Sequence, residues 1–139
     1  MKSKVLTLAN KLVGQGWNRS MAMFKAWVII KTGQLESKVA GISLPNRQRA
    51  ADRLTRYNPD SINITLQRDY TNEHDRNAVA VMASVNGSQC YQMGYLPQGL
   101  AMYIAPLMDA GKAVNSAFKA IKGKYYDWMN YGMCISLNV

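Results

Sequence analysis

The segment TNEHDRNAVAVMASVNGSQCYQMGYLP, residues 71–97, decides the fold of this chain. Six consecutive polar residues at 72–77 precede the small, apolar and partly β-branched run at 78–82. Asn86 and Gly87 then form a strong hairpin signal, because both residue types tolerate positive φ. The segment therefore predicts a polar loop at the mouth of a two-stranded ribbon, which is a common way to place a binding site on a rigid scaffold.

Large side chains alternate after the turn. Tyr91, Met93 and Tyr95 are separated by one residue each, which predicts a returning strand with one large and partly aromatic face. We expect Tyr91 and Tyr131 to fill the interior. Tyr95 and the loop at 125–128 stand beside glycine turns and charges, so we expect them to be exposed.

The flanking sequence predicts a mainly β domain with short helices, of the α+β class. Helical spacing at 4–13 and again up to residue 31 predicts an N-terminal helical hairpin, which packs on the domain or docks a partner. We therefore divide the chain into a helical extension, 1–36, and a β domain, 37–139. Predicted strands lie at 38–44, 62–67, 78–82, 91–95, 114–121 and 131–139, with helices beginning at 46 and covering 99–110. Six short strands with two inserted helices indicate a small, partly open barrel.

Composition limits the classes of protein. A chain of 139 residues with 48% hydrophobic residues fits one domain with a real core. No uncharged apolar run reaches about 18 residues, and the N-terminal residues do not resemble a secretory signal. Cys90 and Cys134 stand in strand-like apolar contexts, so we interpret them as reduced core thiols of a cytoplasmic protein.

Charge points to a polyanionic partner. Lysine and arginine total 17 against 8 acidic residues, a formal net charge of +9. The first 60 residues hold 11 basic and 3 acidic side chains, which is a net +8. Such a bias favours nucleic acid, although a basic surface that only keeps the protein soluble has the same composition.

Catalysis is not indicated. His74, the one histidine, stands beside Asp75, but a base with an orienting carboxylate also needs a nucleophile, a metal or a second acid. No nucleotide loop, nucleophile elbow or paired metal-ligand spacing is present in the sequence. We therefore predict no enzyme activity, no metal site and no cofactor.

Two motifs carry a family resemblance. The pattern N-x-x-D-x-N-A-x-x-V begins at Asn72, and Gly94-Tyr95-Leu96-Pro97 follows it. Together with the residues around Gly41 and the segment 100–111, they resemble the HIRAN domain over roughly residues 37–138. Free-standing members of that family occur in bacteria and phages, and others stand at the front of DNA-remodelling translocases. The resemblance implies an OB-like β-barrel with two helices.

The resemblance also implies a site for the 3′ end of single-stranded DNA. Asp75 matches the acidic position and would contact the terminal 3′-hydroxyl, while His74 would meet the terminal base. Tyr95 matches a position that bonds the strand backbone. Gln98 departs from the family pattern, because a basic residue there commonly contacts phosphate.

A second departure follows Gly41. Eukaryotic DNA-binding members carry an arginine and an aromatic residue where this chain has Ser43 and Leu44. Arg47 and Arg49, in the next predicted helix, are the candidates to compensate. The further candidate contacts lie in the lysine- and aromatic-rich loop between the last two strands: Lys124, Tyr126 and Trp128.

These patterns predict a non-enzymatic, single-stranded DNA-binding module that recognises 3′-hydroxyl ends in bacterial or phage replication, repair or recombination. Two alternatives remain open from the sequence. One is a protein-interaction adaptor that recruits a partner through the N-terminal helices. The other is an RNA-binding barrel, because stacking and phosphate contacts do not distinguish RNA from DNA.

Overall fold

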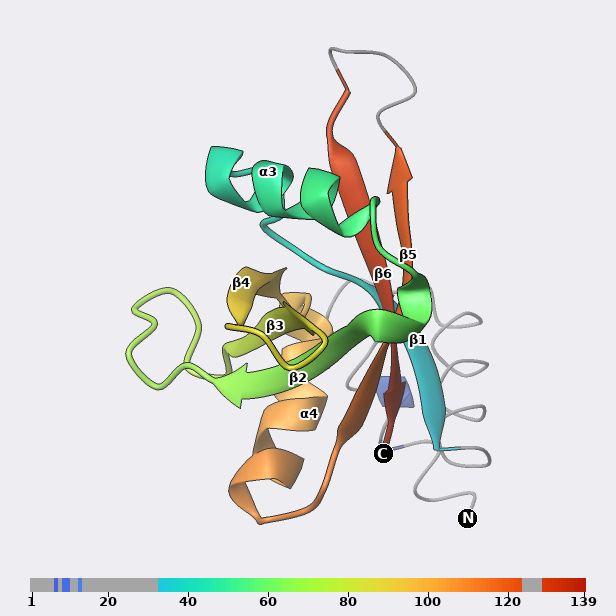
Figure 1. The fold of residues 1–139 in the computed structure, drawn as a ribbon. Coiled ribbons are helices and arrows are strands. Elements are labelled where there is room, and N and C mark those ends of the chain that lie inside the picture. Colours follow the sequence, from blue (N-terminus) through green and yellow to red (C-terminus); the bar gives the residue numbers. More distant parts are fainter. Residues whose placement is uncertain (1–6, 8, 11–12, 14–32, 124–128) are drawn as a thin grey trace.

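The computed structural model describes residues 7, 9, 10, 13, 33–123 and 129–139 (Figure 1). The predicted N-terminal helical hairpin lies almost wholly outside the described residues, and so do the candidate contacts Lys124, Tyr126 and Trp128. From residue 33 onward the elements follow in the order β1 (Gln34–Lys38), α3 (Pro45–Leu54), the 3-10 helix η1 (Pro59–Ser61), β2 (Ile62–Arg68), β3 (Val79–Val85), β4 (Tyr91–Tyr95), α4 (Gln98–Asp109), β5 (Asn115–Gly123) and β6 (Tyr131–Asn138). The prediction of a mainly β domain with two inserted helices is confirmed.

In the part of the chain that the structure describes, the strands form two antiparallel, three-stranded sheets. One has the order β1-β6-β5 and the other the order β2-β3-β4. Within the described residues, the segment after β1 meets β4 at the isolated bridge between Ala40 and Tyr95. On the other side, Ser116 Oγ of β5 donates to the Ile64 carbonyl of β2 at 2.9 Å, but the two strands form no ladder. The two sheets do not close into a barrel, so the mainly β architecture is confirmed and the predicted partly open, OB-like barrel is not.

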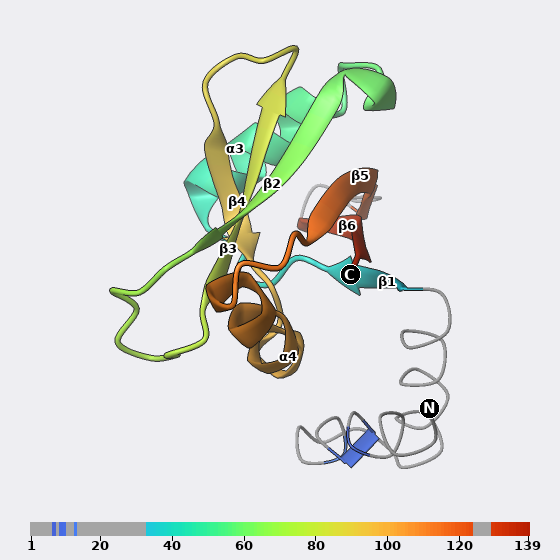
Figure 2. The same ribbon diagram turned by 90° about the horizontal axis from the view of Figure 1, so that it is seen from below.

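One hydrophobic core among the described residues draws on both sheets and on α3 and α4; Figure 2 shows the arrangement of these elements from below. Met133, Ile135 and Leu137 are buried and alternate with half-buried neighbours, as expected of a strand with one face in the core. Val79 and Val81 of β3 are fully buried. Burying side chains of this size stabilises the fold by about 1.5–3 kcal/mol each. The core fixes the positions of β3 and β4, whose ends carry the candidate site.

Helix α3 begins at Pro45, because proline suits the first helical turn, where its missing N–H is not needed. Its inner face buries Ala51 and Leu54, as the sequence predicts. The helix lies over β4 and beside β6 (Figure 1). Its arginines therefore stand on the exposed side of a helix that the core holds in place.

Gln48 fixes α3 to the neighbouring sheet. Its amide nitrogen donates to the carbonyls of Ile42 and Tyr131 at 2.9 and 3.0 Å, and its amide oxygen accepts from the Tyr131 N–H at 2.8 Å. The Tyr131 hydroxyl in turn donates to Asp52 Oδ1 at 2.7 Å, which raises the pKa of that phenol. Two side chains of one helix thus bind the start of β6.

The first strand lies earlier than predicted. β1 ends at Lys38, and Gly41, with φ +74°, begins a turn through residue 44 where the sequence predicted continued strand. Small residues around Gly41 satisfy the alternation of a strand equally well in a turn, so the pattern did not locate the boundary. The correction leaves Ser43 and Leu44 on an exposed turn.

A bulge interrupts the predicted alternation in β4. Tyr95 pairs with Ala80 and Tyr91 with Ala83, and the register shifts between them. Paired residues share a face of the sheet, and Ala80 and Ala83 are an odd number of residues apart. Tyr91 and Tyr95 therefore lie on opposite faces, and Tyr91 is 52% exposed, so its predicted interior position is wrong.

The cysteines also differ from expectation. Both are free, but Cys90 is exposed and Cys134 is half-buried, so neither is a core thiol. Cys90 precedes β4 and belongs to the connection between two strands, where an apolar-looking context does not imply burial.

Candidate nucleic-acid interface

Tyr95, the last residue of β4, is fixed through its backbone. Its N–H donates to the Ala40 carbonyl at 2.9 Å, and its carbonyl accepts from the Ala40 N–H at 2.7 Å. The approach is this close because Gly94 has no side chain: a Cβ there would lie 2.2 Å from the Ala40 oxygen. The bridge places the Tyr95 ring beside the turn that follows Gly41.

A cation covers the same ring. The Arg47 guanidinium of α3 lies 5.6 Å from the centre of the Tyr95 ring, within the range of a cation–π interaction. Arg47 Nη1 also donates to the Gly41 carbonyl at 2.8 Å. Arginine carries five N–H donors, so this geometry leaves others for an anionic ligand.

The Tyr95 hydroxyl meets an acid that the sequence did not single out. It donates to Asp69 Oδ2 at 2.9 Å, while Asp69 Oδ1 accepts from the Thr71 hydroxyl at 2.8 Å and the Thr71 N–H at 3.2 Å. These hydrogen bonds, first that of the Thr71 hydroxyl and then that of Tyr95, lower the pKa of Asp69. Asp69 therefore joins Tyr95 to the start of the polar loop.

The polar loop is ordered by side-chain caps. Asn72 Oδ1 accepts from the N–H groups of His74 and Asp75 at 2.9 and 3.0 Å. Asp75 Oδ1 accepts from the Asn77 N–H at 2.9 Å. Among the described residues, no hydrogen-bond partner is found for Asp75 Oδ2. One oxygen of the Asp75 carboxylate thus stabilises the loop, and the other oxygen has no described hydrogen-bond partner.

A buried arginine supports the base of the loop. The Arg68 guanidinium donates to the carbonyls of Ala78 and Arg76 at 2.6 and 3.1 Å, and its Nε donates to Asp109 Oδ1 at 3.0 Å. The Tyr70 hydroxyl also donates to Asp109 Oδ1, at 2.8 Å. Arg68, followed by Tyr70, lowers the pKa of Asp109, and the Asp109 hydrogen bond raises that of Arg68. The C-terminal end of α4 is thereby bound to the start of the loop, and Arg68 joins it to the carbonyls at the far end.

The structure brings some of the predicted site residues together. Arg47 contacts Tyr95, and Asp69 connects Tyr95 to the loop that carries His74 and Asp75. His74 is exposed and Asp75 is half-buried. The described contacts do not join either residue directly to Tyr95.

The remaining described candidates stand apart from that network. Gln98 is the exposed first residue of α4. Arg49 donates to Asn46 on its own helix. Ser43 and Leu44 are exposed on the turn before α3, and the bonds described for the site do not include their side chains.

The sequence reasoning missed Asp69 and Arg68. Arg68 continues the series Ile62, Ile64, Leu66 on the inner face of β2, and a charged residue in an apolar series signals a buried ion pair. Its side chain is only 8% exposed. No comparable signal identifies Asp69, because its hydrogen bond to Tyr95 joins residues that are 26 positions apart in the sequence.

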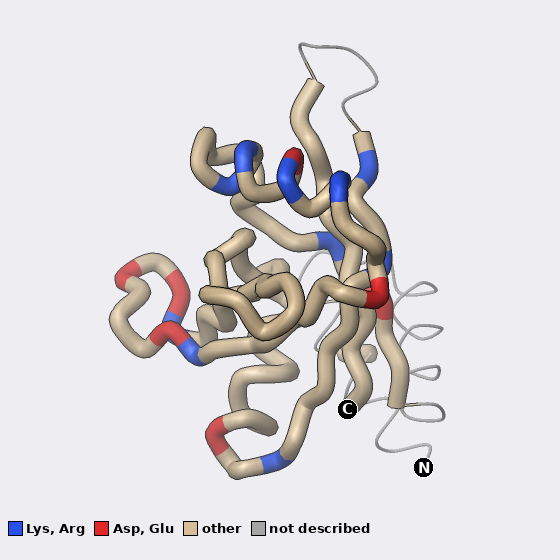
Figure 3. Tube along the Cα trace, in the orientation of Figure 1, with Lys and Arg blue, Asp and Glu red and all other residues tan. Residues whose placement is uncertain are grey.

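Charges divide around Tyr95. Arg47, Arg49 and Arg53 lie on α3 and Arg56 just after it, while Asp69, Glu73 and Asp75 outnumber Arg76 on the polar loop (Figure 3). Asp52, the one acidic residue of α3, bonds Arg56 and Tyr131. Tyr95 contacts both regions, with Arg47 over its ring and Asp69 at its hydroxyl. This arrangement suits a ligand with an anionic backbone and a neutral, hydroxylated end.

The described residues hold no group of three His, Cys, Asp or Glu side chains placed to bind a metal ion. None of the helices in the same ranges combines the length and the apolar character that a membrane span requires.

Comparison with known proteins identifies the family of this chain. A search of curated proteins gave no match. A protein from Lactobacillus plantarum of known structure is 21% identical, with a TM-score of 0.50, over 76% of this chain and 95% of that one. The HIRAN domain of human HLTF is 23% identical, with a TM-score of 0.49, over 76% of this chain and 73% of that one. The family model of the HIRAN domain matches residues 32–133, most of the chain. The chain therefore belongs to the HIRAN domain family, whose domain is a DNA-binding module and is not catalytic by itself.

Proposed function

We propose that this chain is a non-enzymatic, single-stranded DNA-binding module that recognises 3′-hydroxyl ends. Its setting would be DNA replication, repair or recombination in the cytoplasm. The observation that carries the proposal is the Asp75 carboxylate, which uses Oδ1 to cap Asn77 and has no described partner for Oδ2. A carboxylate accepts a hydrogen bond from a hydroxyl and repels a phosphate.

The neighbouring groups support a strand end over a free small molecule. Arg47 supplies a cation for the last phosphate, and the Tyr95 ring lies directly beneath it. His74 is exposed on the loop, within one residue of Asp75, where its ring can meet the terminal base. In this arrangement the strand backbone follows the basic helix, and its hydroxyl end enters the acidic loop.

Specificity for the end follows from the chemistry of Asp75. A hydrogen bond to a charged group contributes about 1.5–3 kcal/mol, which corresponds to about 10- to 150-fold in affinity. A strand that ends in a 3′-hydroxyl should therefore bind at least about 10- to 150-fold more tightly than the same strand with a 3′-phosphate, because repulsion of the phosphate adds to the loss of the hydrogen bond. Titration of labelled oligonucleotides by fluorescence anisotropy measures this ratio directly.

Substitutions separate the hydroxyl contact from the shape of the loop. Asp75→Ala should remove most of the preference for the hydroxyl end, and Asp75→Asn should retain part of it, because the amide oxygen still accepts. Asn72→Ala is the matched control: it removes the caps of His74 and Asp75 but leaves the carboxylate. That variant should weaken both strand ends alike. Equal binding of both ends by the unmodified protein would refute the proposal.

A further inference from the structure

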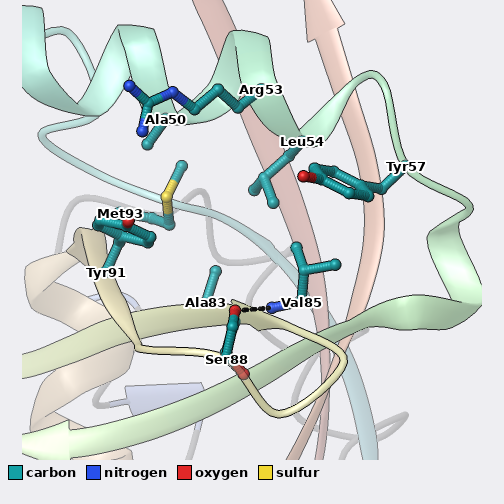
Figure 4. Close-up of a pocket in the computed structure, with 10 residues that line it drawn as sticks. Ala50, Arg53, Leu54, Tyr57, Ala83, Val85, Ser88, Tyr91 and Met93 are labelled. Atoms are coloured by element: carbon teal, nitrogen blue, oxygen red, sulfur yellow. Dashed lines mark hydrogen bonds between the residues drawn. The ribbon is translucent and has the colours of Figure 1, made fainter.

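A hollow lies between α3 and the β3–β4 hairpin, at the Tyr91 end of β4 and away from Tyr95 (Figure 4). We call it the α3 pocket, and its volume is about 170 Å³. Its lining residues are Ala50, Arg53, Leu54, Tyr57, Ala83, Ser84, Val85, Ser88, Tyr91 and Met93. Helix and hairpin thus enclose a mainly apolar space. The proposed site for the 3′ end, around Tyr95 and Asp75, which we call the end site, does not use it.

Two tyrosines and an arginine surround the opening. Tyr57 and Tyr91 lie on opposite sides of it, and Arg53 extends above it from α3 (Figure 4). Tyr57 is 50% exposed and Tyr91 is 52% exposed. Large rings left half in water beside an apolar floor are typical of a binding surface.

The size of the α3 pocket limits its ligand. An apolar cavity of about 150 Å³ takes up one benzene ring, so about 170 Å³ suits a single planar ring system. Pockets for drug-sized molecules and cofactors begin at about 300 Å³. An unpaired base and an aromatic side chain both satisfy this limit.

The charge of the side chains around the α3 pocket distinguishes between these two ligands. Arg49 and Arg53 are exposed on α3 and Arg56 is exposed just after it, and Asp52 already accepts from Tyr131 and from Arg56. The exposed side of the helix beside the pocket is therefore cationic. An unpaired base brings a phosphate with it, whereas an aromatic side chain does not, so the rim favours nucleic acid.

We propose that the α3 pocket binds one unpaired base of a strand whose 3′ end occupies the end site. This inference rests on the proposed function. Arg47 and Arg53 are six residues apart on α3, about 9 Å along the axis. Stacked nucleotides rise about 3.4 Å each, so the base in the pocket is about three nucleotides from the end. Arg53 binds its phosphate, and the two tyrosines enclose its ring.

A length series tests the inference. Thymidine oligonucleotides of two and eight nucleotides, labelled at the 5′ end, are titrated against the full chain by fluorescence anisotropy. The longer strand should bind more tightly, and Tyr91→Thr should weaken it by about 5- to 150-fold, the range of one base–aromatic stack. The dinucleotide should be unaffected, because it reaches only the end site. Tyr91→Phe should bind like the unmodified protein, because the ring is kept.

The proposed contact between Arg53 and a phosphate has its own matched control. Arg53→Ala should weaken the longer strand more than Lys112→Ala, which removes an equal charge from an exposed position after α4. Thermal unfolding of each variant separates a binding effect from a folding effect. Unchanged affinity of Tyr91→Thr for the longer strand overturns the inference. So does a self-association that this substitution abolishes, because the pocket would then hold a second copy of the chain.

The experiments can refute the end site and the base pocket independently of each other. If Asp75→Ala does not change the preference for strand ends but Tyr91→Thr still reduces the gain with length, the end site is refuted; base binding in the α3 pocket then stands, but not its distance from the strand end. If Asp75→Ala acts as expected and strand length has no effect, the end site stands and the base pocket is refuted.

Discussion

Gly94→Ala tests how the site is held together. The added Cβ would lie 2.2 Å from the Ala40 carbonyl oxygen and 2.7 Å from Val39 Cγ1. The first neighbour is backbone, so it cannot rotate away, and the bridge between Ala40 and Tyr95 must open. That bridge consists of two backbone hydrogen bonds, at 2.7 and 2.9 Å.

The magnitude follows from these contacts. Two hydrogen bonds contribute about 1–3 kcal/mol together, and overpacking a core position costs about 1–3 kcal/mol. We therefore expect Gly94→Ala to reduce the free energy of unfolding by about 2–6 kcal/mol. Urea unfolding followed by far-ultraviolet circular dichroism measures the change, and end binding should weaken at the same time, because Tyr95 loses its support.

Gly132→Ala is the control for Gly94→Ala. It also adds one methyl group to a glycine in a strand, but the nearest atom to its Cβ is the Lys122 oxygen at 3.8 Å, an ordinary contact. Its φ lies outside the left-handed region, so the substitution should be neutral or should stabilise by up to about 1 kcal/mol. A Gly94→Ala variant within 1 kcal/mol of the unmodified protein would refute the packing argument.

Two further predictions concern charge. If the three arginines of α3 and Arg56 just after it contact phosphates, affinity for a short single strand should fall with salt at a log–log slope near −3, about −0.7 per contact, and Arg47→Gln should reduce the steepness of that slope by about 0.7. A flat salt response in binding titrations would exclude the helix as the backbone contact. Asp109 has a lowered pKa in the fold, so its contribution to stability is present above about pH 4 and is lost as the pH falls through the folded pKa. Asp109→Asn should therefore lower the urea midpoint at pH 7 and should lose less stability than the unmodified protein between pH 5 and pH 3; parallel losses would contradict this assignment.

The strands and helices from residue 45 onward were predictable because local patterns determine them. Alternation in β2, the turn at Asn86 and Gly87, and the apolar positions of α3 each depend on neighbours in the sequence. Asn86 and Gly87 indeed take φ of 52° and 76°. Closure of the sheets depends on contacts between distant segments, which no period in the sequence encodes.

The candidate site was predictable where a motif supplied it. The polar loop and Tyr95 were identified from the motif, but Asp69, which connects them, was not. The α3 pocket was missed for a related reason. One extra residue in β4 sends Tyr91 to the face beneath α3, and an alternation count cannot detect a bulge.

The opposite charges on the two sides of Tyr95 bear on how the proposed complex would select an end. A strand that continued past the end site would place a phosphate where the terminal hydroxyl is proposed to bind. At about 4 Å from the Asp75 carboxylate, that phosphate would be repelled by about 4 kcal/mol at an effective dielectric constant of about 20. The hydroxyl contact contributes only about 1.5–3 kcal/mol. Exclusion of internal positions would therefore contribute more to end recognition than attraction of the end itself. On this argument, Asp75→Ala should gain affinity for a strand with a 3′-phosphate, in addition to losing affinity for the hydroxyl end.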